Sequence, residues 1–165
     1  MLLIRQLDPA DSLAHLTSLL HRAYAHLAAM GLNYTAVDQT AETTARRIEG
    51  GHCLVAEYGG ELAGTVLAKP TDAASECEYF TRDGVATLRQ FAVEPRLQGR
   101  GIGLALIRAC EAWAREHGFG ELALDTAEPA THLVRLYSRL GFSAVGHVQW
   151  PGKVYRSVVM SKTLR

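Results

Sequence analysis

The stretch "VEPRLQGRGIGLALIRACEAW", residues 93–113, limits the fold more than any other part of the chain. It begins as a β-type run, crosses a glycine-rich turn and continues as an apolar helical pattern. The first turn of a helix has N–H groups without intrahelical acceptors and carries the positive end of the helix dipole. Gly99, Gly101 and Gly103 would let an anion approach that backbone closely, and Arg100 adds a cation. The stretch predicts a diphosphate cradle; the alternative is a glycine turn that packs a helix closely against a strand.

The remaining sequence alternates between β-type and helix-type patterns. Early strands are joined by a hairpin around Gly59 and Gly60, whereas later strands are separated by helices. We therefore expect an α/β protein with a mixed sheet, antiparallel first and partly parallel later. The expected strands are 2–7, 52–58, 61–70, 85–93, 121–127, 142–150 and 153–164, and the expected helices end near residues 30, 50, 117 and 140.

Composition excludes several classes of protein. The 165 residues predict one domain spanning 1–165, and 48% hydrophobic residues suffice for a buried core. Seventeen basic residues balance seventeen acidic ones, which argues against general nucleic-acid binding. The three cysteines are odd in number, lie far apart and lack metal-ligand spacing, so we expect no disulfide framework, no metal and a reducing cytoplasm. Arg5 and Asp8 interrupt the apolar run of a signal peptide, and no segment is apolar enough to span a membrane.

Two other phosphate-binding motifs fit poorly. A P-loop would need Lys followed by Ser or Thr after its last glycine, and neither is present. The dinucleotide-binding pattern G-x-G-x-x-G is not met either. Asp125 lies roughly where that fold places an acidic residue, but the strands before the turn do not alternate with helices as that fold requires.

The pattern that does fit is Q/R-x-x-G-x-G/A, at Gln98, Gly101 and Gly103. Residues 88–146 also contain a strand ending "FAV", a later strand and the segment "LYSRLGF". Together with the glycine pattern, these features resemble the GNAT superfamily of acyl-CoA-dependent N-acyltransferases. The resemblance implies a mixed, partly splayed central sheet of about six to seven strands flanked by helices. It also implies acetyl-CoA as cosubstrate and an amine as acceptor. Dimerisation through C-terminal strands is common among members, so a homodimer is one assembly that the resemblance allows.

The resemblance assigns the cofactor-binding residues by position. Members of the family pair the pantetheine arm with backbone groups at the end of the fourth strand, where a bulge splays that strand from the next. Those positions here are Phe91, Ala92 and Val93. The pyrophosphate would bind the turn and the polar side chains beside it: Gln98, Gly99, Arg100, Gly101, Ile102, Gly103 and Leu104.

Tyr137, in "LYSRLGF", falls where the family often places a tyrosine near the thioester sulfur. Its hydroxyl would protonate the departing thiolate as a general acid; the alternative is a half-buried aromatic residue of a helix. This chain departs from the family pattern just before that tyrosine. Ala130 stands where many members have a cofactor-binding Asn, and Leu133 where they have Ala, leaving Thr131 and His132 as the nearby polar residues.

The acceptor side of the site is less well specified. Some members use a carboxylate near the start of the fourth strand as general base, but the matching residue here is Thr87. The loop before that strand supplies Glu76, Glu78 and Asp83 as candidates, and Glu78 is our predicted acceptor-binding carboxylate; the alternative is that all three are solvated loop charges. Tyr34 and His26 lie in the segment that covers the acceptor in relatives. The acidic run "SECEYFTRD" favours a cationic acceptor such as a polyamine, an aminoglycoside or a protein amine.

We therefore predict a GNAT-like N-acetyltransferase in which a neutral amine attacks acetyl-CoA directly, with Tyr137 catalytic and Tyr34 and Glu78 near the acceptor. The alternative is a non-catalytic acyl-CoA-binding or sensing module on the same fold, which would keep the glycine turn but need neither Tyr137 nor a base.

Overall fold

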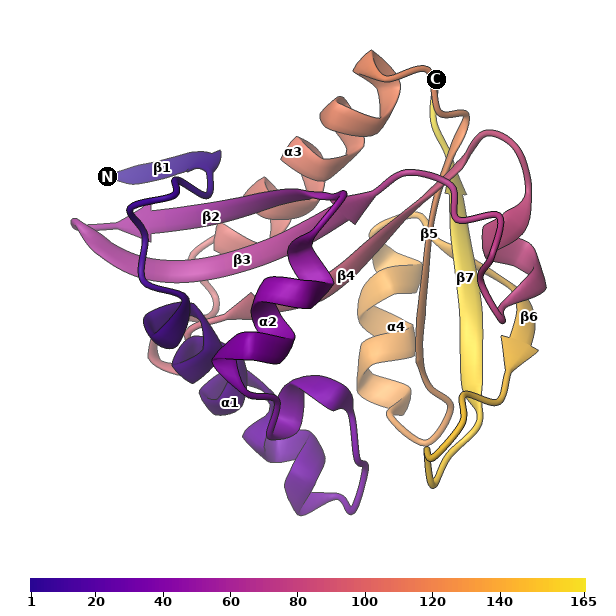
Figure 1. The fold of residues 1–165 in the computed structure, drawn as a ribbon, viewed down its shortest axis with the longest axis horizontal. Helices are drawn as coiled ribbons and strands as arrows, with labels where there is room; N and C mark the ends of the chain where they lie inside the picture. The colour runs from indigo at the N-terminus through magenta and orange to yellow at the C-terminus, as the bar shows by residue number, and fades with distance from the viewer.

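The computed structural model describes all residues from 1 to 165 as a seven-stranded sheet with four α-helices (Figure 1). The strand order is β1-β2-β3-β4-β5-β7-β6. The strands are β1 (Leu2–Gln6), β2 (His52–Tyr58), β3 (Glu61–Lys69), β4 (Val85–Val93), β5 (Glu121–Ala127), β6 (Ser143–Val148) and β7 (Ser157–Thr163). The α-helices are α1 (Leu13–Ala29), α2 (Ala41–Ile48), α3 (Ile102–Glu116) and α4 (Thr131–Arg139), and short 3₁₀ turns span Thr35–Val37, Glu78–Thr81 and Pro95–Leu97.

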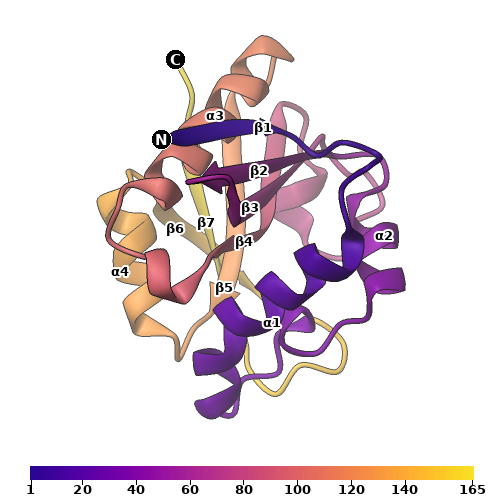
Figure 2. The same cartoon turned by 90° about the vertical axis from the view of Figure 1, so that its left-hand side faces the viewer.

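The helices cover both faces of the sheet. Helices α1 and α2 lie on one face, and α3 and α4 lie on the other (Figure 2). The largest core cluster lies under α3, where Leu106, Ile107 and Cys110 are fully buried. Leu16 and Leu20 of α1 are buried in two smaller core clusters, which pack this helix against the sheet. None of the helices combines the length and the apolar content that a membrane crossing requires.

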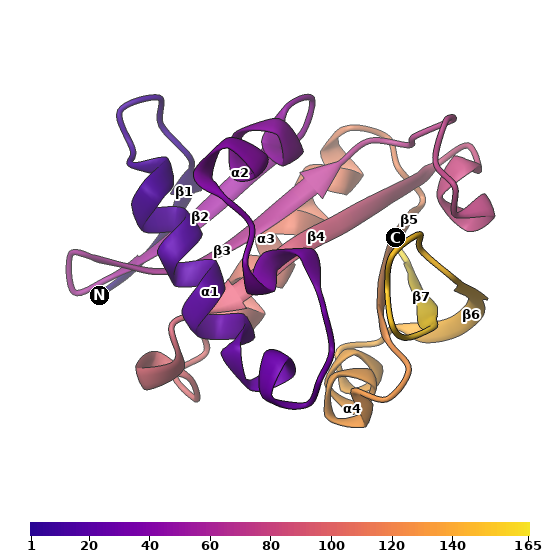
Figure 3. The same ribbon diagram turned by 60° about the horizontal axis from the view of Figure 1, so that its bottom comes forward.

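Strands β4 and β5 are the only parallel neighbours, and they stay together over a short distance. They pair only between Val85–Thr87 and Glu121–Ala123. Beyond that point β4 stays with β3, whereas β5 stays with β7, so the sheet opens like a V (Figures 1 and 3). The mixed, splayed sheet expected from the sequence is confirmed.

A β-bulge lies where β4 leaves β5. Thr65 and Leu67 of β3 pair with Ala92 and Arg89, so two residues of β4 face one of β3. Gln90, inside this bulge, is the one non-glycine residue with positive φ, at 51°. That conformation costs free energy and persists only where the surroundings hold it in place.

The expected strands 142–150 and 153–164 are too long, because a loop replaces their facing ends. Strand β6 ends at Val148 and β7 begins at Ser157. The Gln149 side-chain amide donates to the carbonyls of Lys153 and Tyr155, both at 3.0 Å, and so closes the loop. Side-chain bonds to the backbone compete with the sheet ladder there, which propensity alone does not reveal.

The contact between β3 and α3 generates a stability prediction. A Cβ atom on Gly64 would lie 2.9 Å from both the Ala92 carbonyl oxygen and Leu106 Cδ1. Gly64→Ala should lower the free energy of unfolding by about 1–3 kcal/mol through overpacking. Gly146→Ala, in edge strand β6, is the matched control because a Cβ there meets nothing within 4 Å. Chemical denaturation measures both, and equal stability of the two variants would contradict this packing.

Candidate active site

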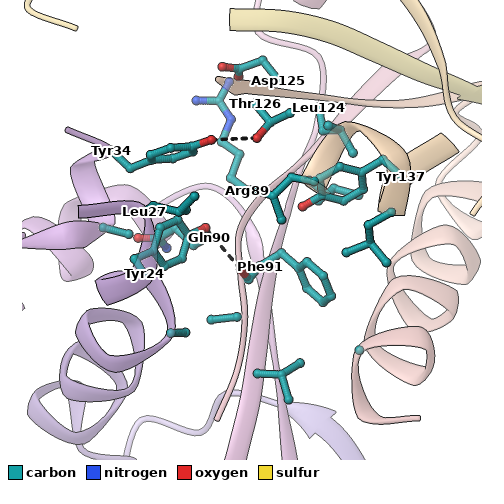
Figure 4. Close-up of a pocket in the computed structure, with 18 of the residues that line it drawn as sticks. Tyr24, Leu27, Tyr34, Arg89, Gln90, Phe91, Leu124, Asp125, Thr126 and Tyr137 are labelled. Carbon is teal, nitrogen blue, oxygen red and sulfur yellow. Dashed lines mark hydrogen bonds between the residues drawn. The ribbon is translucent and has the colours of Figure 1, made fainter. Parts of the chain in front are cut away.

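A cavity of about 830 Å³ occupies the gap between β4 and β5. Its wall comes from α1, α2, β4, β5, α3, α4, the β6–β7 loop and the segments that precede α2 and α3. Figure 4 shows residues of several of these elements facing one another across the gap. The splayed sheet therefore creates the cavity. The predicted glycine turn and the predicted acceptor residue Tyr34 both belong to its wall.

One end of the cavity is the N-terminus of α3. Gly101 is its N-cap residue, with φ 80°, and no side chain caps the helix. A Cβ on Gly99 or Gly101 would meet nothing within 4 Å, so the space beside these backbone groups is open. A Cβ on Gly103 would instead lie 3.0 Å from Phe91 Cζ. Gly99 and Gly101 therefore leave open space, and Gly103 allows close packing of α3 against β4; the diphosphate itself stays a prediction.

The free edge of β4 forms the middle of the cavity. Glu94 N–H donates to Ala63 O of the neighbouring strand at 2.8 Å. Because backbone groups of a strand alternate between its two edges, the N–H of Val93 faces the gap left by β5. The Phe91 carbonyl on that edge accepts a hydrogen bond of 3.2 Å from the Tyr24 hydroxyl (Figure 4).

Tyr137 is buried on α4, and its ring lies near Phe91 and Phe142. Its hydroxyl lines the cavity and forms no hydrogen bond with the protein, and Figure 4 shows it turned toward the gap. Burial, followed by the nearby Tyr24 and Tyr34, raises the pKa of Tyr137 well above its usual value of 10. The hydroxyl therefore stays protonated at neutral pH and can donate its proton.

The far end of the cavity is polar, and of its residues sequence analysis placed only Tyr34 near the acceptor. Asp125 of β5 accepts a hydrogen bond of 2.7 Å from the indole Nε1 of Trp150. Beside it, the Tyr34 hydroxyl lies 2.8 Å from Thr126 Oγ1 and accepts from the Ala127 N–H at 2.9 Å (Figure 4). The available signal was a carboxylate in the middle of the apolar strand "ELALDTA".

The structure brings most of the predicted site residues to this cavity. The predicted residues in its wall are Tyr34, Phe91, Ala92, Val93, Gln98, Gly99, Gly101, Ile102, Gly103, Leu104 and Tyr137. Arg100 is not among them: its exposed guanidinium carbon lies 5.5 Å from the centroid of the Tyr58 ring. Its contact with a ligand stays a prediction.

The loop carboxylates do not reach the cavity. Glu76, Glu78 and Asp83 are exposed and form no part of its wall. Phe80 is the reason, because it turns inward and packs with Val85 in a separate core cluster, which leaves the acidic side chains in solvent. The structure therefore does not support Glu78 as the acceptor-binding carboxylate.

Two histidines lie at the cavity wall where the family Asn is missing. His26 Nε2 of α1 and His132 Nε2 of α4 are 3.1 Å apart. Ala130 is buried against Leu27 and Ala127, so it cannot replace the missing polar contact. Burial, followed by His26, lowers the pKa of His132.

Comparison with known proteins agrees with this geometry. Residues 16–142 match the Acetyltransferase (GNAT) family. The chain is 34% identical over 99 residues to human N-acetyltransferase 8B, a match that covers 59% of this chain and 41% of that protein. The chain thus spans about two fifths of the length of the curated relatives it matches, with 41%, 44% and 41% covered in three of them.

Solved structures share the fold over the whole chain. The ribosomal-protein-S18-alanine N-acetyltransferase from Escherichia coli has a TM-score of 0.75 at 20% identity, covering 99% of this chain and 94% of that one. A GNAT family acetyltransferase from Elizabethkingia anophelis with acetyl-CoA bound has a TM-score of 0.70 at 17% identity, covering 99% and 98%. With its splayed sheet and its family match over residues 16–142, the chain belongs to the GNAT acetyltransferase family.

Proposed function

We propose that this protein is an N-acetyltransferase that moves an acetyl group from acetyl-CoA to a primary amine by direct attack. The observation that carries the proposal is the single cavity that joins the uncapped N-terminus of α3 to the free Tyr137 hydroxyl. Acetyl-CoA would supply the acetyl group as a thioester. The open space at Gly99 and Gly101 fits a diphosphate at a helix N-terminus, and the free edge of β4 fits an extended pantetheine arm.

Each part of the cavity has a chemical role in this proposal. The Val93 N–H stabilises negative charge that develops on an oxygen placed in the gap. The Tyr137 hydroxyl donates a proton to the departing sulfur. Asp125 is the one carboxylate in the cavity wall, where the Trp150 indole holds it, and it is the candidate to accept the proton of the incoming ammonium.

The cysteines support direct transfer rather than a covalent enzyme intermediate. Cys53, Cys77 and Cys110 are all buried, and none belongs to the cavity wall. Burial raises the pKa of all three thiols, that of Cys110 to about 12, which suppresses the reactive thiolate. Three unpaired cysteines also agree with our proposal of a cytoplasmic location.

A matched pair of glycines tests the phosphate site. Gly101→Ala places a methyl group beside the first turn of α3 and should weaken acetyl-CoA binding by an order of magnitude or more. Gly118→Ala at the other end of α3 is the control, because Gly118 also has positive φ (81°) and open space around it. Both variants carry the same backbone strain, so calorimetry should find the loss of affinity only at Gly101. Equal acetyl-CoA affinity in the two variants would show that the diphosphate does not bind at this turn.

A second substitution tests proton donation. Tyr137→Phe keeps the ring and removes only the hydroxyl, so turnover should fall about 10²–10⁴-fold, toward the low end because a thiolate is a fair leaving group. Acetyl-CoA affinity and melting temperature should hold, since the hydroxyl has no partner in the protein. Tyr34→Phe provides the contrast: it breaks two hydrogen bonds and should lower the free energy of unfolding by about 1–3 kcal/mol.

Steady-state kinetics and thermal melting separate these outcomes. Full turnover in Tyr137→Phe, under conditions where chemistry limits the rate, would make Tyr137 a packing residue.

A further inference from the structure

The far end of the cavity carries an excess of positive charge. Arg47 of α2, Arg89 of β4 and Lys153 of the β6–β7 loop all belong to its wall, whereas Asp125 is the single carboxylate there. The chain forms ion pairs elsewhere, but none of the three cations has a carboxylate partner within 4.0 Å. A half-buried cation without a counter-ion is costly, which makes this end of the cavity a candidate site for an anion.

Arg47 is held in place by a buried network of amides. Its Nη1 donates to Gln39 Oε1 at 2.9 Å. Gln39 Nε2 in turn donates to Gln90 Oε1 at 2.7 Å and to Thr44 Oγ1 at 2.8 Å, and these three polar residues are buried. The network thus ties Arg47 to the bulge of β4. It uses one of the five N–H donors of the guanidinium, which leaves the others free.

Arg89 also lacks a carboxylate partner, and its guanidinium carbon lies 5.7 Å from the centroid of the Phe80 ring. Its one hydrogen bond runs from Nε to Thr87 Oγ1 at 3.3 Å, and Figure 4 shows its side chain extending from β4 toward Asp125. Burial lowers the pKa of Arg47; among the neighbouring groups Tyr24 and Asp125 raise it, whereas the charge of Arg89 lowers it. An anion between Arg47 and Arg89 would relieve both their desolvation and their repulsion.

The same charges argue against a polycationic acceptor. Asp125 can balance one positive charge, and the acidic loop that favoured such an acceptor lies outside the cavity. A polyamine or an aminoglycoside would bring several positive charges against Arg47, Arg89 and Lys153.

Building on the proposed acetyl transfer, we propose that the acceptor is a small amine that also carries an oxyanion, as an amino acid carries its carboxylate. Arg47 and Arg89 bind the oxyanion, and the amine lies toward Asp125. The Tyr34 and Tyr155 rings, whose centroids lie 5.2 Å apart, line the same end and supply apolar surface for a side chain.

Matched ligand pairs test this proposal without requiring turnover. Calorimetry on the protein saturated with CoA compares L-alanine, L-leucine and L-phenylalanine with ethylamine, 3-methylbutylamine and 2-phenylethylamine, which lack only the carboxylate. In at least one pair the amino acid should bind about 10–100-fold more tightly than the amine. The aminophosphonate analogue of phenylalanine shows whether the oxyanion is a carboxylate or a phosphate. The proposal is overturned if, in every pair, the amine binds as tightly as its partner that carries the carboxylate or phosphonate.

Three arginine variants then locate the oxyanion. Arg47→Gln and Arg89→Gln should each weaken binding of the oxyanion-bearing ligands about 10–100-fold without weakening binding of the amines. Arg46→Gln is the control, because Arg46 neighbours Arg47 on α2 but is exposed and outside the cavity. An equal loss of affinity for the ligands with and without the oxyanion would contradict the assignment.

The two proposals fail in different ways. If CoA does not bind the wild-type protein, the proposed acetyl transfer is overturned. The same titrations of amino acids and amines into the free protein still show whether Arg47 and Arg89 bind an oxyanion. If CoA binds and CoA release is fastest with amines that lack an oxyanion, acetyl transfer stands and the proposed acceptor class is wrong.

Discussion

The backbone of Gln90 is the constraint on which the rest of the site depends. Its positive φ puts a bulge in β4 at the point where that strand parts from β5. The buried hydrogen bond from Gln39 to Gln90 holds this strained residue in place. The bulge lies just beyond Thr87, the last residue of β4 that pairs with β5. The strain is local, and the gap between β4 and β5 forms the cavity described above.

The cavity in this gap has two ends, and different chemical groups supply the positive charge at each end. At one end, the uncapped first turn of α3 offers backbone N–H groups to an anion. At the other end, Arg47 and Arg89 offer guanidinium groups beside Asp125. The Gln39–Gln90 hydrogen bond connects these features, because the network that steadies the bulge also anchors Arg47. Shape and charge in this site therefore depend on the same buried amides.

Features of the site that depend on a few neighbouring residues could be predicted from the sequence. The glycine turn and the start of α3 follow from backbone requirements within a few residues, and Tyr137 followed from the motif around it. Arg47, Arg89 and Asp125 come from α2, β4 and β5, and only the folded sheet brings them together. Glu78 shows the converse: it is close to β4 in sequence, but the inward packing of Phe80 leaves it in solvent.

The central claim is that the gap beside β4 and the first turn of α3 bind one extended ligand. Backbone ¹⁵N–¹H chemical shifts of Val93, Ile102 and Gly103 test it when the protein is titrated with acetyl-CoA and, separately, with S-acetylpantetheine, which lacks the diphosphate. We expect acetyl-CoA to shift all three signals and S-acetylpantetheine to shift only that of Val93. Saturating acetyl-CoA that leaves Ile102 and Gly103 unshifted would contradict it.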